Sequence, residues 1–179
     1  MHYIEIFNPF FEALAYTLPS IVVLVTALFL LTRFFENEER KRDYELRVKN
    51  RNTTLPIKLQ AYERMILFLE RISPNNLIFR VKKQGMSAKD LETALLKEIR
   101  TEFEHNLSQQ LYVSPNTWQV IKNTKEEIIK LINLSFTKLS DDATAMDLSK
   151  AIFDNMMQME RSPTQKAIMY IKKEAQQYL

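Results

Sequence analysis

The sequence predicts an all-α protein with one N-terminal transmembrane helix followed by a cytoplasmic bundle of five or six helices. Three observations lead to this fold class. Residues 13–32 contain no charged side chain, the 179-residue chain has a single glycine, and apolar residues after position 55 recur every three to four residues. A long uncharged run is typical of a membrane span. Scarce glycine disfavours hairpin turns, and the spacing predicts amphipathic helices.

The predicted transmembrane segment reads ALAYTLPSIVVLVTALFLLT, and Phe34 and Phe35 extend it to residue 35. At a rise of 1.5 Å per residue it covers about 30 Å, the thickness of the hydrocarbon core of a bilayer. A cleavable signal peptide is the first alternative, but residues 1–12 lack the basic side chains that precede a signal's apolar core. A buried core helix is the second alternative. Pro19 fits a span, because transmembrane helices tolerate proline.

The basic residues predict the orientation of the span. All 25 Lys and Arg follow it, and we interpret the nearest four as topology anchors: Arg33, Arg40, Lys41 and Arg42. The positive-inside rule then places the N-terminus outside and the C-terminal part in the cytoplasm. The predicted location is the cell inner membrane, crossed once. Acidic residues alternate with these basic ones, so net attraction to anionic lipid is weak.

The chain is predicted to have four parts. Residues 1–12 form a short external tail, 13–35 the transmembrane helix, 36–54 a charged juxtamembrane helix and linker, and 55–179 the cytoplasmic α-helical domain. The run Asn52-Thr53-Thr54 is expected to end the juxtamembrane helix, and Pro56 to open the next one.

Capping patterns predict further helices within the domain. Ser87 with Asp90 forms a capping-box pattern, and Ser114-Pro115 and Ser162-Pro163 each pair an N-cap serine with a first-turn proline. The helix from Ser87 is expected to reach Tyr112. Another helix, carrying the residues from Leu148 to Met159, is expected after Asp141-Asp142. Ser73-Pro74-Asn75-Asn76 reads as a turn, and the segment Leu77–Lys82 stays open between a short strand, a connecting loop and a helical turn.

Composition excludes several kinds of chemistry. One glycine cannot supply a glycine-rich phosphate loop, and the absence of cysteine excludes thiol nucleophiles and cysteine-ligated zinc. We therefore predict no enzymatic activity and no cofactor. Mixed charge without a clustered basic face also predicts no nucleic-acid partner. One alternative is a metal-dependent enzyme that uses Glu102 and His105 in an oligomer, because a Glu-x-x-His step places carboxylate and imidazole on one helix face.

Methionine is concentrated near the C-terminus, and Met156, Met157 and Met159 form a possible partner surface. Flexible thioether side chains suit adaptable grooves, although they also fill ordinary cores. On the helix from Pro56, a polar contact strip is a second candidate, with a solvated face as its alternative; it comprises Tyr62, Glu63, Arg64 and Arg71. These features predict a membrane-anchored, non-enzymatic interaction or scaffold protein. Its expected partners are the bilayer, through residues 13–35, and another protein or a second copy of the chain.

The stretch LPIKLQAYERMILFLERISPNNL, residues 55–77, resembles the most recognisable block of an uncharacterised bacterial family. The resemblance covers most of the chain and implies one N-terminal span and a helical cytoplasmic part, but no activity, ligand or catalytic residue. One span leading into a charged helix is also similar to the membrane stalk subunit of rotary ATP synthases. That stalk is one long helix, whereas Pro56, Pro74, Pro115 and Pro163 are expected to divide this chain into a bundle.

Overall fold

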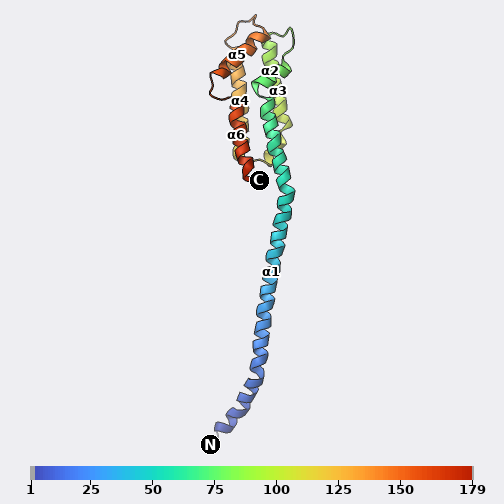
Figure 1. Cartoon of the computed structure of the whole chain (residues 1–179), viewed down its shortest axis with the longest axis vertical. Coiled ribbons are helices and arrows are strands. Elements are labelled where there is room, and N and C mark those ends of the chain that lie inside the picture. Colours follow the sequence, from blue (N-terminus) through green and yellow to red (C-terminus); the bar gives the residue numbers. More distant parts are fainter. Residues whose placement is uncertain (1–2, 179) are drawn as a thin grey trace. The chain divides into compact units, whose positions relative to one another are not determined.

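The computed structural model describes the backbone of residues 3–178, and side chains for Ala13 and from Tyr16 onward. Met1 and His2 lie outside the described residues, as do the side chains of the rest of the predicted tail 1–12. The chain divides into two units, Met1–Thr53 and Thr54–Leu179. Every regular element in the described part is helical, which confirms the all-α class (Figure 1).

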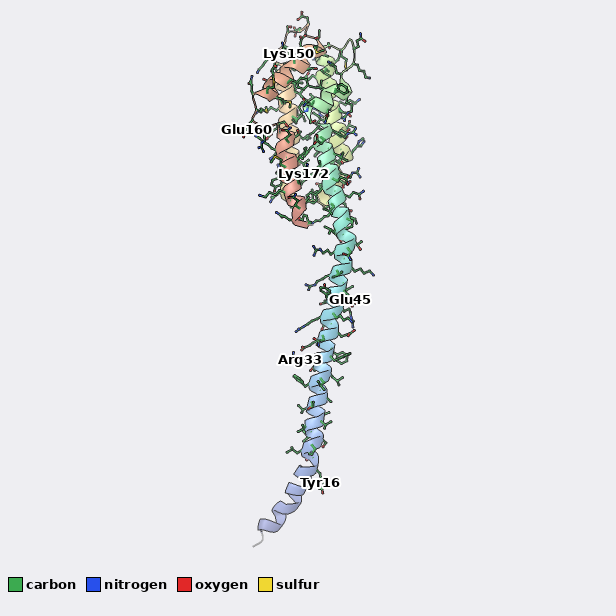
Figure 2. All side chains as sticks on the ribbon, in the orientation of Figure 1. Tyr16, Arg33, Glu45, Lys150, Glu160 and Lys172 are labelled. Atoms are coloured by element: carbon green, nitrogen blue, oxygen red, sulfur yellow. The ribbon has the colours of Figure 1, made fainter. Side chains whose placement is uncertain are left out.

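The first unit consists of a single helix, the N-terminal part of α1, which runs over Tyr3–Arg71. Within Tyr16–Arg71, a window of mean hydropathy 2.1 is entirely exposed. Val23, Leu24 and Leu30 are each more than half exposed although they are strongly apolar. Figure 2 shows side chains standing out from the ribbon in the stretch between Tyr16 and Arg33. The chain thus contains one helix that is long and apolar enough to cross a membrane.

The predicted helix break at Asn52-Thr53-Thr54 is wrong, because α1 continues through these residues and through Pro56 to Arg71. Asn and Thr are weak helix formers but cost well under 1 kcal/mol per residue. The Thr53 hydroxyl donates to the Lys49 carbonyl at 3.0 Å, which keeps its bonding inside the helix. Residues 51–54 are exposed, so water can bond to the carbonyl that Pro56 leaves without a donor.

The second unit comprises the C-terminal end of α1 and the helices that follow it. These are α2 (Pro74–Val81), α3 (Ala88–His105), the short 3₁₀ turn η1 (Leu107–Leu111), α4 (Pro115–Phe136), α5 (Ala145–Met157), α6 (Pro163–Ala175) and η2 (Gln176–Tyr178). Helix α3 packs against α4 and α5, and α4 packs against α6. Six α-helices therefore lie within the described residues.

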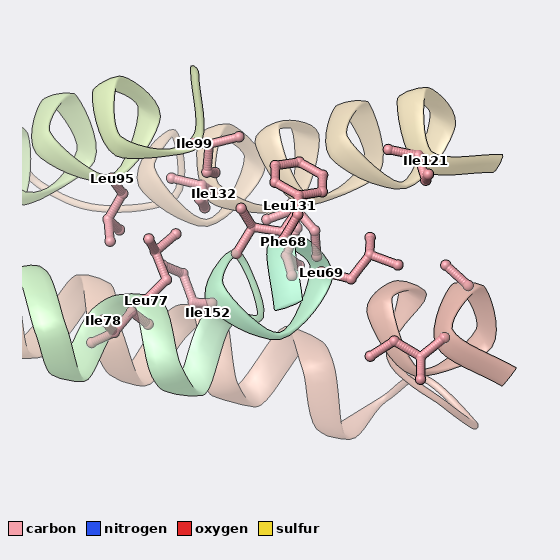
Figure 3. Close-up of a cluster of buried hydrophobic side chains, with 14 of the residues drawn as sticks. Phe68, Leu69, Leu77, Ile78, Leu95, Ile99, Ile121, Leu131, Ile132 and Ile152 are labelled. Atoms are coloured by element: carbon pink, nitrogen blue, oxygen red, sulfur yellow. The ribbon is translucent and has the colours of Figure 1, made fainter. Parts of the chain in front are cut away.

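One apolar core joins the helices of the second unit (Figure 3). The end of α1 contributes Phe68 and Leu69, and α2 contributes Leu77, all at most 1% exposed. The predicted apolar faces supply most of the remainder, which includes Leu91, Leu95, Ile99, Ile121, Ile128, Ile132, Leu148, Ile152, Ile168 and Ile171. Trp118 stacks on Phe103 at a centroid distance of 5.4 Å at the edge of this core.

The predicted N-caps of three helices are confirmed. Ser87 and Asp90 form the complete capping box of α3, while Ser114 and Ser162 accept hydrogen bonds from the backbone of the first turns of α4 and α6. Helix α5 has a second capping box, formed by Thr144 and Asp147, which the sequence analysis did not predict. The helix therefore begins at Ala145, after the predicted boundary at Asp141-Asp142. The two boxes face each other: Ala88 N donates to the Ala143 carbonyl, and Ala145 N to the Met86 carbonyl.

Three expected boundaries differ in the structure. The segment Leu77–Lys82 is helical up to Val81. The predicted turn at Ser73–Asn76 contains the first turn of α2, because Ser73 and Pro74 suit the start of a helix as well as a turn. Helix α3 ends at His105, where the Asn106 side chain donates to the Glu102 carbonyl at 2.8 Å. Helix α5 ends at Met157, so Met159 lies beyond it.

Candidate interaction surface

A groove between α2 and α5 has a mostly apolar lining, and we call it the α2/α5 groove. Its volume is about 640 Å³, and its lining comprises Asn75, Ile78, Phe79, Lys82, Met146, Ser149, Lys150 and Phe153. This volume falls within the range of ordinary ligand pockets. The two capping boxes fix the adjacent starts of α3 and α5, which places the α5 wall of the groove beside α2.

Local sequence explains why α2 faces outward on this side. The helix has only eight residues, and Leu77 and Ile78 turn inward to the core at 0% and 4% exposure. A helix rotates by about 100° per residue, so the third apolar residue in the run, Phe79, cannot share their direction. Its side chain is 90% exposed, the highest value among the large apolar side chains described in the second unit. Met146 is 62% exposed on the opposite wall.

The charges in the groove lining are all positive. The Lys82 ammonium lies 3.8 Å from the Met146 sulfur, a weak acceptor. Neither Lys82 nor Lys150 forms an ion pair with a carboxylate in the part of the chain that the structure describes. Asp147, next along α5, is bound to its own cap through the Thr144 amide and hydroxyl. These hydrogen bonds lower the pKa of the Asp147 carboxyl, and the Lys150 ammonium makes a smaller contribution in the same direction.

The sequence reading missed this surface, although one signal was available. Leu77-Ile78-Phe79 is a run of three apolar residues, and any helical interpretation of that run leaves one of them outside the core. A strand or a loop at these positions carries no such requirement, so the exposed Phe79 follows only from the helical alternative.

The three methionines predicted as a partner surface are separated in the structure. Met156 is partly buried and packs against the core, and Met157 is 78% exposed. Met159 lies in the loop after α5 and lines a different hollow of about 450 Å³, next to Leu131, Leu134 and residues of both charges. Met156 and Met157 are consecutive on α5 and therefore point about 100° apart, whereas Met159 lies beyond the end of that helix.

The predicted polar strip on α1 is divided between interior and surface. Tyr62 is 2% exposed, and its hydroxyl donates to Glu174 of α6, while Glu63 and Arg64 are exposed. Ser114 and Thr117 of α4 donate to the other carboxylate oxygen of Glu174, at 3.0 and 2.7 Å. Burial would raise the pKa of Glu174, but these hydrogen bonds and the nearby Lys58 ammonium lower it overall. The cluster connects α1, α4 and α6.

Glu102 and His105 have separate surroundings. Glu102 is 8% exposed and accepts from Arg71 Nε at 2.6 Å, with Arg80 at 3.6 Å, whereas His105 is exposed at the end of α3. Two guanidinium groups therefore occupy the carboxylate that the metal interpretation requires. Within the described residues there is no group of three or more His, Cys, Asp or Glu side chains suited to a metal ion.

The predicted topology anchors follow the apolar part of α1, and all are exposed. The Arg33 guanidinium lies 5.4 Å from the Phe29 ring centroid and pairs with Glu36 at 3.4 Å. Arg40, Lys41 and Arg42 lie about two turns further along the helix. Exposed basic residues that alternate with acidic ones directly after an apolar helix segment are compatible with the end of a span.

Comparison with known proteins gives one match. The model of a family described as "Family of unknown function (DUF7935)" covers residues 8–178, which include both the apolar segment and the helical unit. No curated protein and no solved structure matches the chain. The chain therefore belongs to the DUF7935 family of unknown function.

Proposed function

We propose that this protein is a single-pass, membrane-anchored interaction module without enzymatic activity, with its helical unit at the cytoplasmic face. One observation carries the proposal: the apolar segment of α1 is exposed on all sides. Each fully exposed Leu or Val forgoes roughly 1.5–3 kcal/mol of burial free energy in water. A bilayer removes this cost, because it surrounds the helix with hydrocarbon.

The second unit supports the interaction role. Two of its carboxylates are engaged in structural pairs, Glu102 with Arg71 and Glu174 with Tyr62. Its most exposed large apolar side chain, Phe79, lies instead on an open groove. Exposed apolar patches of this kind are typical of protein-binding surfaces.

Membrane fractionation of the full chain tests the anchor. Leu24→Arg with Leu28→Arg places two charges in the apolar segment, each costing about 2.5–3.5 kcal/mol at the centre of a span. We expect the wild type to stay in the pellet after an alkaline carbonate wash and to be released by detergent, and the double variant to be lost from the pellet.

The matched control is Tyr44→Arg with Val48→Arg, which has the same spacing on the same helix but lies in its charged part, where both side chains are exposed. This variant should fractionate as the wild type does. A wild-type chain that carbonate alone releases from membranes would refute the anchor.

A further inference from the structure

We propose that the α2/α5 groove binds an acidic amphipathic helix of another protein. Apolar side chains of that helix would enter the groove, and its carboxylates would pair with Lys82 and Lys150. This inference rests on the proposed function and deepens it, because it states the chemistry of the partner that a membrane-anchored module holds.

The spacing of the lining residues supports a helical partner. On the α2 wall they are Asn75, Ile78, Phe79 and the C-cap residue Lys82, and on α5 they are Met146, Ser149, Lys150 and Phe153. Both sets follow the pattern i, i+3, i+4, i+7, so each wall is one stripe of a helix about two turns long. A third helix fits between two such stripes by the packing that joins helices in bundles, with its own anchors at the same spacing.

The charge of the groove defines the partner further. The lining combines apolar side chains (Ile78, Phe79, Met146 and Phe153) with two ammonium groups, and it contains no carboxylate. A basic helix would bring like charges together, and a neutral one would leave both lysines unpaired while covering them. Carboxylates flanking an apolar stripe complement both features of the groove, which favours specificity and faster association.

The open shape of the groove favours a helix over a lipid chain. A pocket for a small apolar ligand encloses most of the ligand's surface. Here the walls are open to solvent, with Phe79 at 90% exposure and Met146 at 62%. A helix needs such an open trough, because only one of its faces is covered.

Photo-crosslinking in native membranes tests the inference with the full chain. A benzoyl-phenylalanine at position 79 conserves an aromatic side chain and reacts with whatever lies in the groove. The same group at Leu111, which is 76% exposed outside the groove, is the control. We expect an adduct at position 79 whose crosslinked peptide, identified by mass spectrometry, carries carboxylates around a helical apolar stripe. Position 111 should give none.

Charge reversal tests whether the two lysines contribute to binding. With the crosslinker at position 79, Lys82→Glu with Lys150→Glu should reduce the adduct at least tenfold, whereas Lys138→Glu with Lys172→Glu changes the same net charge elsewhere and should leave it unchanged. Circular dichroism checks that both variants stay folded. Since all four lysines lie outside the core, we expect equal helix content.

The results that would overturn the groove inference differ from those that would refute the proposed function. A lipid adduct, a second copy of this chain, a crosslinked segment without carboxylates, or an adduct that survives charge reversal would overturn the inference. So would the absence of any adduct specific to position 79. If a crosslinker at Met157 captures a protein while position 79 does not, the groove inference fails and the interaction role stands. Loss of membrane association in the fractionation experiment would instead refute the proposed anchor.

Discussion

At the scale of single residues, the second unit depends on a small polar cluster. Glu174 accepts hydrogen bonds from Tyr62, Ser114 and Thr117, which come from two other helices. Burial raises the pKa of Tyr62 well above its usual range, and the Glu174 carboxylate reinforces this by accepting its proton in a hydrogen bond. The phenol therefore stays protonated, and the carboxylate stays charged, at any physiological pH.

The lowered pKa of Glu174 predicts a pH-dependent loss of stability. Because the folded state favours the ionised carboxylate, this stabilisation is complete above the carboxyl's ordinary pKa and is lost as the pH falls through the lowered folded pKa. Glu174→Gln should lower the free energy of unfolding by about 1–2 kcal/mol at pH 7. Urea unfolding of the full chain in mild detergent, followed by Trp118 fluorescence, measures this difference.

The same measurement at lower pH distinguishes a charge effect from a packing effect. The difference between wild type and Glu174→Gln should shrink as the pH falls below about 4, near the ordinary pKa of a Glu carboxyl, and be lost once the pH has fallen through the lowered pKa of Glu174. The exposed Glu63→Gln is the control and should change stability little at either pH. A difference that stays constant down to pH 3 would contradict the electrostatic explanation.

Gly85, the one glycine of the chain, lies in the turn between α2 and α3 at a φ of +82°. No atom lies within 4 Å of the position that a Cβ would take, so a side chain there meets strain but no clash. Gly85→Ala should cost about 1–2 kcal/mol in the same unfolding experiment. Gly85→Asn should cost less, since Asn tolerates this conformation better; equal costs would point to another cause.

At the scale of elements, α3 and α5 begin as a connected pair. Each has a complete capping box, and the backbone amides of Ala88 and Ala145 donate to carbonyls of the opposite loop at 2.9 and 3.1 Å. One amide at each N-terminus thus finds its acceptor, a backbone carbonyl, in the loop that precedes the other helix. This arrangement fixes the end of α5 that borders the groove.

Removal of both caps should therefore be non-additive. Ser87→Ala and Thr144→Ala should each cost about 1 kcal/mol. The double variant should lose at least 0.5 kcal/mol less than their sum, roughly the coupling typical of residues in one network, because the first change already weakens the shared bridge. Ser87→Ala combined with Ser162→Ala, whose cap shares no bond with this pair, should be additive. Additivity in both double variants would contradict a connected pair.

The local signals that could be read from the sequence were the helix starts and apolar faces. Ser87, Ser114 and Ser162 were predictable because an N-cap depends on chemistry within four residues. The continuity of α1 was not, because the effect of Pro56 depends on whether solvent can satisfy the freed carbonyl. The α2/α5 groove was not predicted either, since it arises from two segments that are far apart in the sequence, residues 75–82 and 146–153.

At the scale of the whole molecule, the two units have opposite surface chemistry. The first presents an apolar helix with no buried residue in its most hydrophobic window, while the second buries its apolar faces in one core. Water suits the second unit, and hydrocarbon suits the apolar segment of the first. A membrane anchor carrying a helical module reconciles both, and the basic residues from Arg33 onward give the proposed orientation.

Cysteine labelling tests this account most directly, because the chain has no native cysteine. Single variants Asn8→Cys and Asn116→Cys place one thiol on each side of the proposed span, the second at an exposed position on α4. With a membrane-impermeant maleimide, we expect Asn8→Cys to react in intact cells and Asn116→Cys to react only after permeabilisation. Labelling of Asn116→Cys in intact cells, or equal protection of both thiols, would contradict a single span with the helical unit in the cytoplasm.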